Sequence, residues 1–434
     1  MVDGEQTSGI GVLQGTALTL GALLGTGVIS LPAIAVQKAG PASLVAWAAL
    51  LICSIPLAAT FTALGSRHPG GGGITTYARL ALGDRVARGL GCAFYLAIPI
   101  GSPVAAGFGA AYVSDAFGRG RGTTLVVTAV IIVLVTAMNW FGIRLSAGAQ
   151  LVIAGALVVV LSVTAIVAAP HAHQANLTPF APHGIHGIGA AAAALVWAFA
   201  GWEIMASLSG EYAHPKRDIP RAAAVTLVIV GVLYLAIAYT TVAVLGDEPG
   251  KAPLSSLLVL GVGSAARPVM TVVAILLTIG TMNSYFAGAA RLGSALAAER
   301  TLPGWLQEDG GEPRRALALV GGLGLGATLV MGLADIPSDH LLLIATGTFS
   351  VAYLVATVAA MRILPGGWAR IIAAFSAVVS AVLVAVTGWP VLVSVVLGVV
   401  GAFWPRKPVG PVVDVAMPTE TASVVLPALE DPVL

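Results

Sequence analysis

The amino-acid sequence predicts an all-α integral membrane protein with twelve transmembrane helices, of which the first ten form two five-helix repeats of opposite orientation. Three observations support this prediction. Hydrophobic residues make up 58% of the 434 positions and charged residues only 9%, with a mean hydropathy of +0.96, whereas soluble domains have about 25% charged residues. The chain also divides into apolar runs of membrane-spanning length, and the spacing of these runs repeats.

Each predicted span approaches or exceeds the roughly 20 apolar residues that cross a bilayer. A cytoplasmic N-terminus covers 1–9, and the polar, proline-bearing segment 405–434 is expected to be a disordered cytoplasmic tail. The first repeat, 10–169, has spans near 10–36, 41–65, 88–114, 123–141 and 146–169. The second repeat, 187–362, has spans near 187–212, 220–245, 264–291, 315–334 and 339–362. Two further spans, 369–388 and 390–404, complete the set within 369–404.

The distribution of lysine and arginine predicts the orientation. With the N-terminus inside, the inner segments hold sixteen of the 21 basic residues and the outer segments hold five. An even number of spans places both termini on one side, and basic residues favour the cytoplasmic side of a membrane. We therefore expect cytoplasmic termini.

The repeat is indicated by spacing. Spans 1 and 6 begin at residues 10 and 187, and spans 3 and 8 begin at 88 and 264, so the two pairs have nearly equal offsets. Because each unit has an odd number of spans, the second unit must be inverted in the membrane. Inverted repeats whose first helices are interrupted recur among transporters.

Both first helices of the predicted repeats contain helix-breaking residues. Span 1 contains "GALLGTGVISLP", with Gly25, Thr26 and Gly27 at its middle, and span 6 contains Gly201. A break frees backbone amides and carbonyls, which are tolerated only inside the protein or beside a water-filled cavity. A half-helix N-terminus favours a carboxylate and a carbonyl end favours an ammonium, so two breaks suit a zwitterionic amino acid. The alternative is that these small residues only allow close helix packing.

Glu203 is the one acidic or basic residue well inside a predicted span. A charged side chain there costs roughly 2.5–3.5 kcal/mol even on insertion scales. Residues of this kind are functional candidates, and we expect Glu203 to bind and release a proton. The alternative is that a protonated Glu203 bonds a neighbouring backbone and holds span 6 in place.

Other functional classes lack support in the sequence. The net charge of +2 provides no basic stripe for nucleic acid, and Cys53 and Cys92 form neither a disulfide framework nor a metal motif. We expect no cofactor and no metal. A membrane enzyme with Glu203 as general base would need a second catalytic group inside the spans, and a channel would need a continuous polar stripe. The sequence shows neither.

Five motifs resemble those of the amino acid–polyamine–organocation (APC) transporter superfamily. They are "GTGVISLP" in span 1, "FAGWE" in span 6, "SGEYAHPKRDIPRA" after span 6, "HPGGGGITTYARLALG" after span 2 and "NSYFAGAARLGSALAAERTLP" from span 8. The resemblance covers spans 1 to 10 and is greatest to the bacterial branch that exports methionine and branched-chain amino acids. It implies a LeuT-like fold, alternating access and a place in the inner membrane of a bacterium. It also favours export, with an uptake permease or an exchanger of the same fold as the alternative. The protein is expected to be a monomer or homodimer.

The resemblance also implies a binding site. The backbone at Gly25, Thr26 and Gly27 would bind the substrate carboxylate, and Glu203 would serve proton-linked gating. The span-6 residues would bind the ammonium through their carbonyls or close over the ligand as an aromatic gate, namely Trp197, Phe199, Ala200, Gly201 and Trp202. Side chains around Ile98 to Pro103 in span 3, Asn283 to Tyr285 in span 8 and Thr346 to Thr348 in span 10 would shape the pocket, among them Ile100, Asn283 and Thr346.

One departure from the family leaves the coupling ion open. Many proton-coupled relatives have a lysine in span 5, but "SAGAQLVIAGALVVVLSV" has no basic residue. Glu203 could accept the proton alone, an ion could use oxygens of Asn283 and Ser284, or the protein could exchange substrates. Since no other buried charge is present, we expect neutral, apolar substrates such as methionine, leucine, isoleucine and valine.

Overall fold

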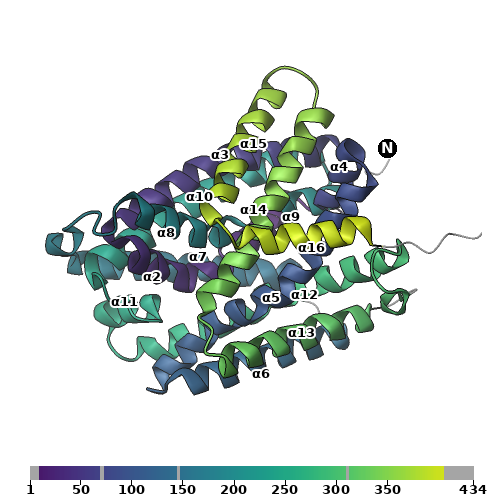
Figure 1. Ribbon diagram of the computed structural model, residues 1–434. Coiled ribbons are helices and arrows are strands. Elements are labelled where there is room, and N and C mark those ends of the chain that lie inside the picture. The colour runs from purple at the N-terminus through teal and green to yellow at the C-terminus, as the bar shows by residue number, and fades with distance from the viewer. Residues whose placement is uncertain (1–8, 69–72, 144–146, 309–311, 405–434) are drawn as a thin grey trace, which may run out of the picture.

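The computed structural model describes residues 9–68, 73–143, 147–308 and 312–404, and these residues form an α-helical bundle (Figure 1). The N-terminal half comprises α1 Val12–Leu23, α2 Gly27–Ala39, α3 Ser43–Arg67, α4 Gly73–Leu82, α5 Asp84–Ala116, α6 Arg121–Trp140 and α7 Ala147–Ala168. The C-terminal half comprises α8 Gly184–Phe199, α9 Trp202–Ser207, α10 Pro215–Thr240, α11 Pro253–Val262, α12 Ala266–Ala298, α13 Arg314–Leu333, α14 Ser338–Ile363, α15 Trp368–Thr387 and α16 Val391–Phe403.

Ten helical runs of the described chain are long and apolar enough to cross a membrane. This number is lower than the twelve predicted spans for two reasons. The run Gly27–Arg67 joins α2 to α3, and α16 has only 13 residues. Large apolar side chains are exposed on the outside of the bundle, for example Phe375 at 58% and Val228 at 65%, as a lipid environment allows.

The observed helices lie over the predicted spans, with ends that differ by a few residues. The predicted tail 405–434 and residues 1–8 lie outside the described residues. Two helices were not predicted, α4 and α11, which are too short to span a bilayer. Figure 1 shows α4 near the N-terminal end of the bundle and α11 at the opposite end.

Helix α5 forms the centre of the bundle. It packs against α6, α12, α13, α14 and α16, and most of its 33 residues are buried. Small residues allow these close approaches, as is usual between membrane helices. At Gly109, for instance, a Cβ atom would lie 2.5 Å from Thr278 Oγ1 of α12, so a larger residue would separate the two helices.

The chain leaves the helical conformation twice inside the bundle. Helix α1 ends at Leu23 and α2 begins at Gly27, whereas α8 ends at Phe199 and α9 begins at Trp202. At the second break Gly201 has φ +140°, a conformation that residues with a Cβ atom rarely adopt. The two breaks face each other, because a Cβ atom at Gly201 would lie 3.2 Å from Leu23 Cδ2.

We expect Gly201→Ala to lower the free energy of unfolding by about 1–3 kcal/mol, because alanine would be strained at this backbone conformation. Thermal unfolding of the protein in detergent micelles measures the loss. The matched control is Gly288→Ala in α12, where a Cβ atom meets nothing within 4 Å. Equal melting temperatures for the two variants would contradict the prediction.

Candidate functional site

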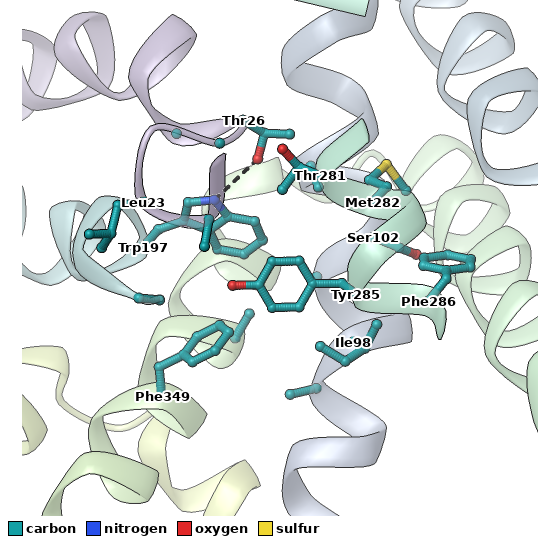
Figure 2. A pocket seen from close by; sticks show the side chains of 18 residues that line it. Leu23, Thr26, Ile98, Ser102, Trp197, Thr281, Met282, Tyr285, Phe286 and Phe349 are labelled. Carbon is teal, nitrogen blue, oxygen red and sulfur yellow. Dashed lines mark hydrogen bonds between the residues drawn. The ribbon is translucent and has the colours of Figure 1, made fainter. Parts of the chain in front are cut away.

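A cavity lies between the two breaks and helices α5, α12 and α14 (Figure 2), and it holds about 580 Å³ of atom-free space of which part is open to solvent. The lining residues are Ala22, Leu23, Gly25, Thr26, Gly27, Ala97, Ile98, Gly101, Ser102, Ala105, Trp197, Ala200, Thr281, Met282, Tyr285, Phe286, Ala345 and Phe349.

The lining is mostly apolar and contains no charged side chain. Its polar side chains are Thr26, Ser102, Trp197, Thr281 and Tyr285. Figure 2 shows the Tyr285 ring between Trp197 and Ile98, with its hydroxyl pointing into the space near Phe349. The cavity therefore suits a small molecule with a neutral side chain.

Main-chain amides at the first break supply positive polarity to the cavity. Within the described residues, no backbone carbonyl accepts a hydrogen bond from the amides of Gly25, Thr26 or Gly27. These amides precede or begin α2, whose N-terminus has a partial positive charge. The first break can thus bind an anionic group of a ligand without any basic side chain.

Carbonyl groups at the breaks are partly satisfied by tyrosines from neighbouring helices. The Tyr234 hydroxyl of α10 contacts the Leu23 carbonyl and, at 2.9 Å, the Ala198 carbonyl. The Tyr353 hydroxyl of α14 lies 3.3 Å from the Phe199 carbonyl. Because each hydroxyl has one proton, it can donate to only one acceptor at a time. A cationic group could therefore compete for these carbonyls.

The Trp197 side chain joins the two breaks. Its Nε1–H donates to Thr26 Oγ1 at 3.3 Å, and its ring meets Phe108 edge to face with centroids 6.1 Å apart. Two glycines make room for the indole, since a Cβ atom at Gly27 or at Gly101 would lie 3.1 Å from it. Trp197 thus forms one wall of the cavity and a contact between α2 and α8.

Glu203 lies behind the second break and is 5% exposed. Its Oε2 accepts hydrogen bonds from the Gly201 amide at 2.9 Å and from the Tyr353 hydroxyl at 2.6 Å. Among the described residues its Oε1 has no hydrogen-bond partner. Glu203 does not line the cavity, so it is separated from a ligand there by the backbone of the break.

Five predicted site residues line the cavity together: Gly25, Thr26, Gly27, Trp197 and Ala200. Three others from span 6 lie beside the cavity without lining it. Phe199 packs edge to face on Tyr234, Trp202 is fully buried among the helices, and Gly201 forms the turn between α8 and α9.

The three residues named individually for spans 3, 8 and 10 lie off the cavity. Ile100 is half-buried, Asn283 Oδ1 accepts a bond of 2.6 Å from Asn139, and the Thr346 hydroxyl donates to the Leu343 carbonyl at 3.1 Å. Ser284 bonds its own helix through the Gly280 carbonyl. Neither Asn283 nor Ser284 therefore provides an oxygen to the cavity for a coupling ion.

Part of the cavity lining falls inside the predicted ranges of spans 3 and 8, namely Ile98, Gly101, Ser102 and Tyr285. The lining faces follow helical periodicity, which brings positions three and four apart together. Once one lining residue per helix is known, this periodicity identifies the rest. The lining residues outside the predicted ranges are Ala97 and Ala105 of α5, Thr281, Met282 and Phe286 of α12, and Ala345 and Phe349 of α14.

Comparison with known proteins shows what this architecture is related to. The family model described as amino acid permease matches residues 10–410. The uncharacterized amino acid permease YecA of Bacillus subtilis is 32% identical over 403 residues, covering 90% of this chain and 94% of the relative. The L-methionine/branched-chain amino acid exporter YjeH of Escherichia coli is 32% identical over 397 residues, covering 89% and 94%.

A more distant relative is named for different substrates. The serine/threonine exchanger SteT of Bacillus subtilis is 25% identical over 304 residues, covering 68% of this chain and 69% of the relative. The family and these relatives are transporters and not enzymes, and they agree with a bacterial inner membrane protein with several spans. The chain belongs to the amino acid permease family of the APC superfamily.

Proposed function

We propose that this protein is a secondary active transporter of neutral, mainly apolar amino acids of the methionine, leucine, isoleucine and valine type. It exports them across the cytoplasmic membrane by alternating access in exchange for protons. The single observation that supports this most is the uncharged cavity between two helix breaks that face each other. The proposed fold is the LeuT-like arrangement of twelve spans, with the broken helices beginning two inverted repeats and with both termini cytoplasmic.

The two ends of the zwitterion bind to opposite polarities. The α-carboxylate receives hydrogen bonds from the free amides at Gly25, Thr26 and Gly27, which begin α2. The α-ammonium competes with the tyrosine hydroxyls for carbonyls at the C-terminal ends of α1 and α8. This arrangement agrees with the binding mode in discontinuous transporter helices, where half-helix ends replace charged side chains.

The substrate side chain extends among Ile98, Phe286 and Phe349, which are apolar. A charged side chain would lose its hydration without meeting an opposite charge, because no acidic or basic residue lines this space. The name of the methionine and branched-chain exporter from Escherichia coli supports the same substrate class.

Protonation of Glu203 changes the hydrogen bonds at the second break. When Glu203 is ionised, the Tyr353 hydroxyl donates to Oε2 at 2.6 Å. When Glu203 holds a proton, Tyr353 is free to donate to the Phe199 carbonyl, 3.3 Å away. This carbonyl ends α8, so the protonation state alters the polarity at the cavity and the junction between α8 and α9. The absence of a basic residue from α7 leaves Glu203 as the proton carrier.

Substrate exchange is a second candidate function, supported by the more distant serine/threonine exchanger. An exchanger would show counterflow of labelled leucine in proteoliposomes but no net efflux in a pH gradient. An exporter coupled to protons would show both. A channel would conduct without saturation, which separates it from both transporters.

We expect Gly27→Leu to abolish counterflow of labelled leucine in proteoliposomes. The added side chain would collide with Trp197 and with Leu31, whose Cδ1 already lies 2.9 Å from the Cβ position, and it would fill the carboxylate site. The control is Gly21→Leu, six residues earlier in α1, where a Cβ atom meets nothing within 4 Å. If both variants insert into the membrane and transport equally, the carboxylate site is misplaced.

We expect Glu203→Gln to keep counterflow but to lose acceleration of leucine efflux by an acidic exterior, because glutamine does not titrate. Efflux from preloaded proteoliposomes, with and without an imposed pH gradient, measures both properties. Glu211→Gln is the control, since this carboxyl group is exposed beyond α9. An unchanged pH response in Glu203→Gln removes this residue from proton coupling.

Competition should follow side-chain charge. We expect unlabelled methionine and leucine to displace labelled leucine at concentrations roughly 100-fold below those of arginine and glutamate, as the cost of an unpaired buried charge implies. Unlabelled serine, used as a further competitor, tests the effect of side-chain size and polarity in the absence of charge. Displacement by arginine at a lower concentration than by leucine would contradict the assignment.

A further inference from the structure

A second hollow lies on the outside of the bundle, between α3 and α10. It is a groove open to the outside, away from the cavity described above and without a shared lining residue. Its lining includes Ile55, Ala59 and Arg67 of α3 and Lys216, Ala224 and Leu227 of α10. The groove ends at Arg67, the last residue of α3, beside Lys216, the second residue of α10.

The floor of the groove results from small side chains on two adjoining helices. Alanines occur on both sides, including Ala59 and Ala224. Farther along the helices the packing is tight, because a Cβ atom at Gly231 would lie 3.0 Å from Leu51 Cδ2. The groove is therefore closed at this inner end and open toward Arg67.

The groove has the length and exposure of an acyl-chain site. From Ile55 to Arg67 it covers about 18 Å of helix at 1.5 Å per residue, slightly more than half of the roughly 30 Å hydrocarbon core of a bilayer. Ile55 is 51% exposed, and its neighbours Ile52 and Val228 are 64% and 65% exposed. In the proposed topology these side chains face lipid.

The open end has two exposed cations without counter-charges. Arg67 donates one hydrogen bond of 3.3 Å to the Ala63 carbonyl, and neither Arg67 nor Lys216 belongs to an ion pair of the described residues. No acidic residue lines the groove. The nearby Asp218 is 4.0 Å from Arg217 instead. A basic pocket between membrane helices on the cytoplasmic side is suited to an anionic lipid head group.

We propose that this groove binds one anionic phospholipid of the cytoplasmic leaflet. The phosphate lies between the Arg67 guanidinium and the Lys216 ammonium, and one acyl chain extends over Ala59 and Ala224 toward Leu227. The inference requires a membrane-embedded bundle with cytoplasmic termini, but it does not depend on which solute the protein transports.

The position of this lipid connects it with the broken helix. Another face of α3 packs on α9 and the turn after it, where a Cβ atom at Gly65 would lie 3.3 Å from the Met205 carbonyl oxygen and 3.2 Å from Ser209 Cβ. Helix α9 also contains Glu203. A lipid that fills the groove supports α3 from the outside against the segment that changes on protonation.

The experiment measures lipid retention by the full chain in native mass spectrometry, with equal amounts of phosphatidylglycerol and phosphatidylcholine of identical acyl chains. The parent should retain one phosphatidylglycerol in preference. In the double variant Arg67→Gln, Lys216→Gln, the preference for phosphatidylglycerol should fall about 25-fold, because each cation contributes about a five-fold effect. The matched control Arg217→Gln, Arg221→Gln removes the same charge from α10 residues that do not line the groove, and should keep the preference.

A second pair of variants tests the acyl chain without changing charge. Ala224→Leu should fill the groove and weaken retention, whereas Val228→Leu, which does not line the groove, should leave it unchanged. These apolar changes are compatible with membrane insertion, so the test does not depend on the charge variants folding. Leucine counterflow is recorded separately, so a failed transport assay is distinguishable from a failed lipid assay.

Three results would overturn the proposal. The first is equal retention of phosphatidylglycerol by the parent and by the double variant of Arg67 and Lys216. The second is displacement of the lipid by millimolar glycerol 3-phosphate or inorganic phosphate, which would make this a site for free phosphate. The third is loss of a dimer instead of a lipid in the groove variants, which would make the groove an interface between two copies.

Discussion

The hydrogen-bonding requirement of backbone groups in a medium without water is the constraint on which the rest of this structure depends. Interrupting a helix inside a bilayer exposes amides and carbonyls that cost several kcal/mol each if unpaired. Here Tyr234 serves carbonyls of α1 and α8, while Tyr353 and Glu203 serve the junction of α8 and α9. The amides before α2 remain, and they face the cavity region. Side chains thus satisfy several of the freed groups, whereas the amides of Gly25, Thr26 and Gly27 have no backbone acceptor among the described residues.

The same constraint determines where small residues are needed. An indole can connect the two breaks only if neighbouring segments lack side chains there, because a Cβ atom at Gly27 or at Gly101 would lie 3.1 Å from Trp197. Gly201 is needed for a different reason, since its φ of +140° is unfavourable for any residue with a Cβ atom. Glycine therefore serves two purposes in these breaks, close packing at the first and backbone geometry at the second.

The carboxyl group of Glu203 is separated from the cavity in this arrangement. The cavity is lined without any ionisable acid or base, and Glu203 lies behind the backbone of the second break. Tyr353 connects the two regions, because its hydroxyl is within hydrogen-bond distance of both Glu203 and the Phe199 carbonyl. In the proposed mechanism, a neutral ligand and a proton therefore occupy separate places and both act on the junction between α8 and α9.

The sequence by itself determined the membrane class, the positions of the long helices, the two breaks and Glu203. Each of these depends on local chemistry: hydrophobic length, glycine conformation, and the cost of a charge in lipid. Lining residues adjacent to the breaks, such as Thr26 and Ala200, were predictable for the same reason. Only the tertiary structure decided which faces of α5, α12 and α14 meet the breaks. Asn283 illustrates the difference, because it is polar and inside a span, yet it bonds to Asn139 while Tyr285 two residues later reaches the cavity. Rotation of a helix about its axis is determined by packing against distant segments, and a residue's type does not encode it.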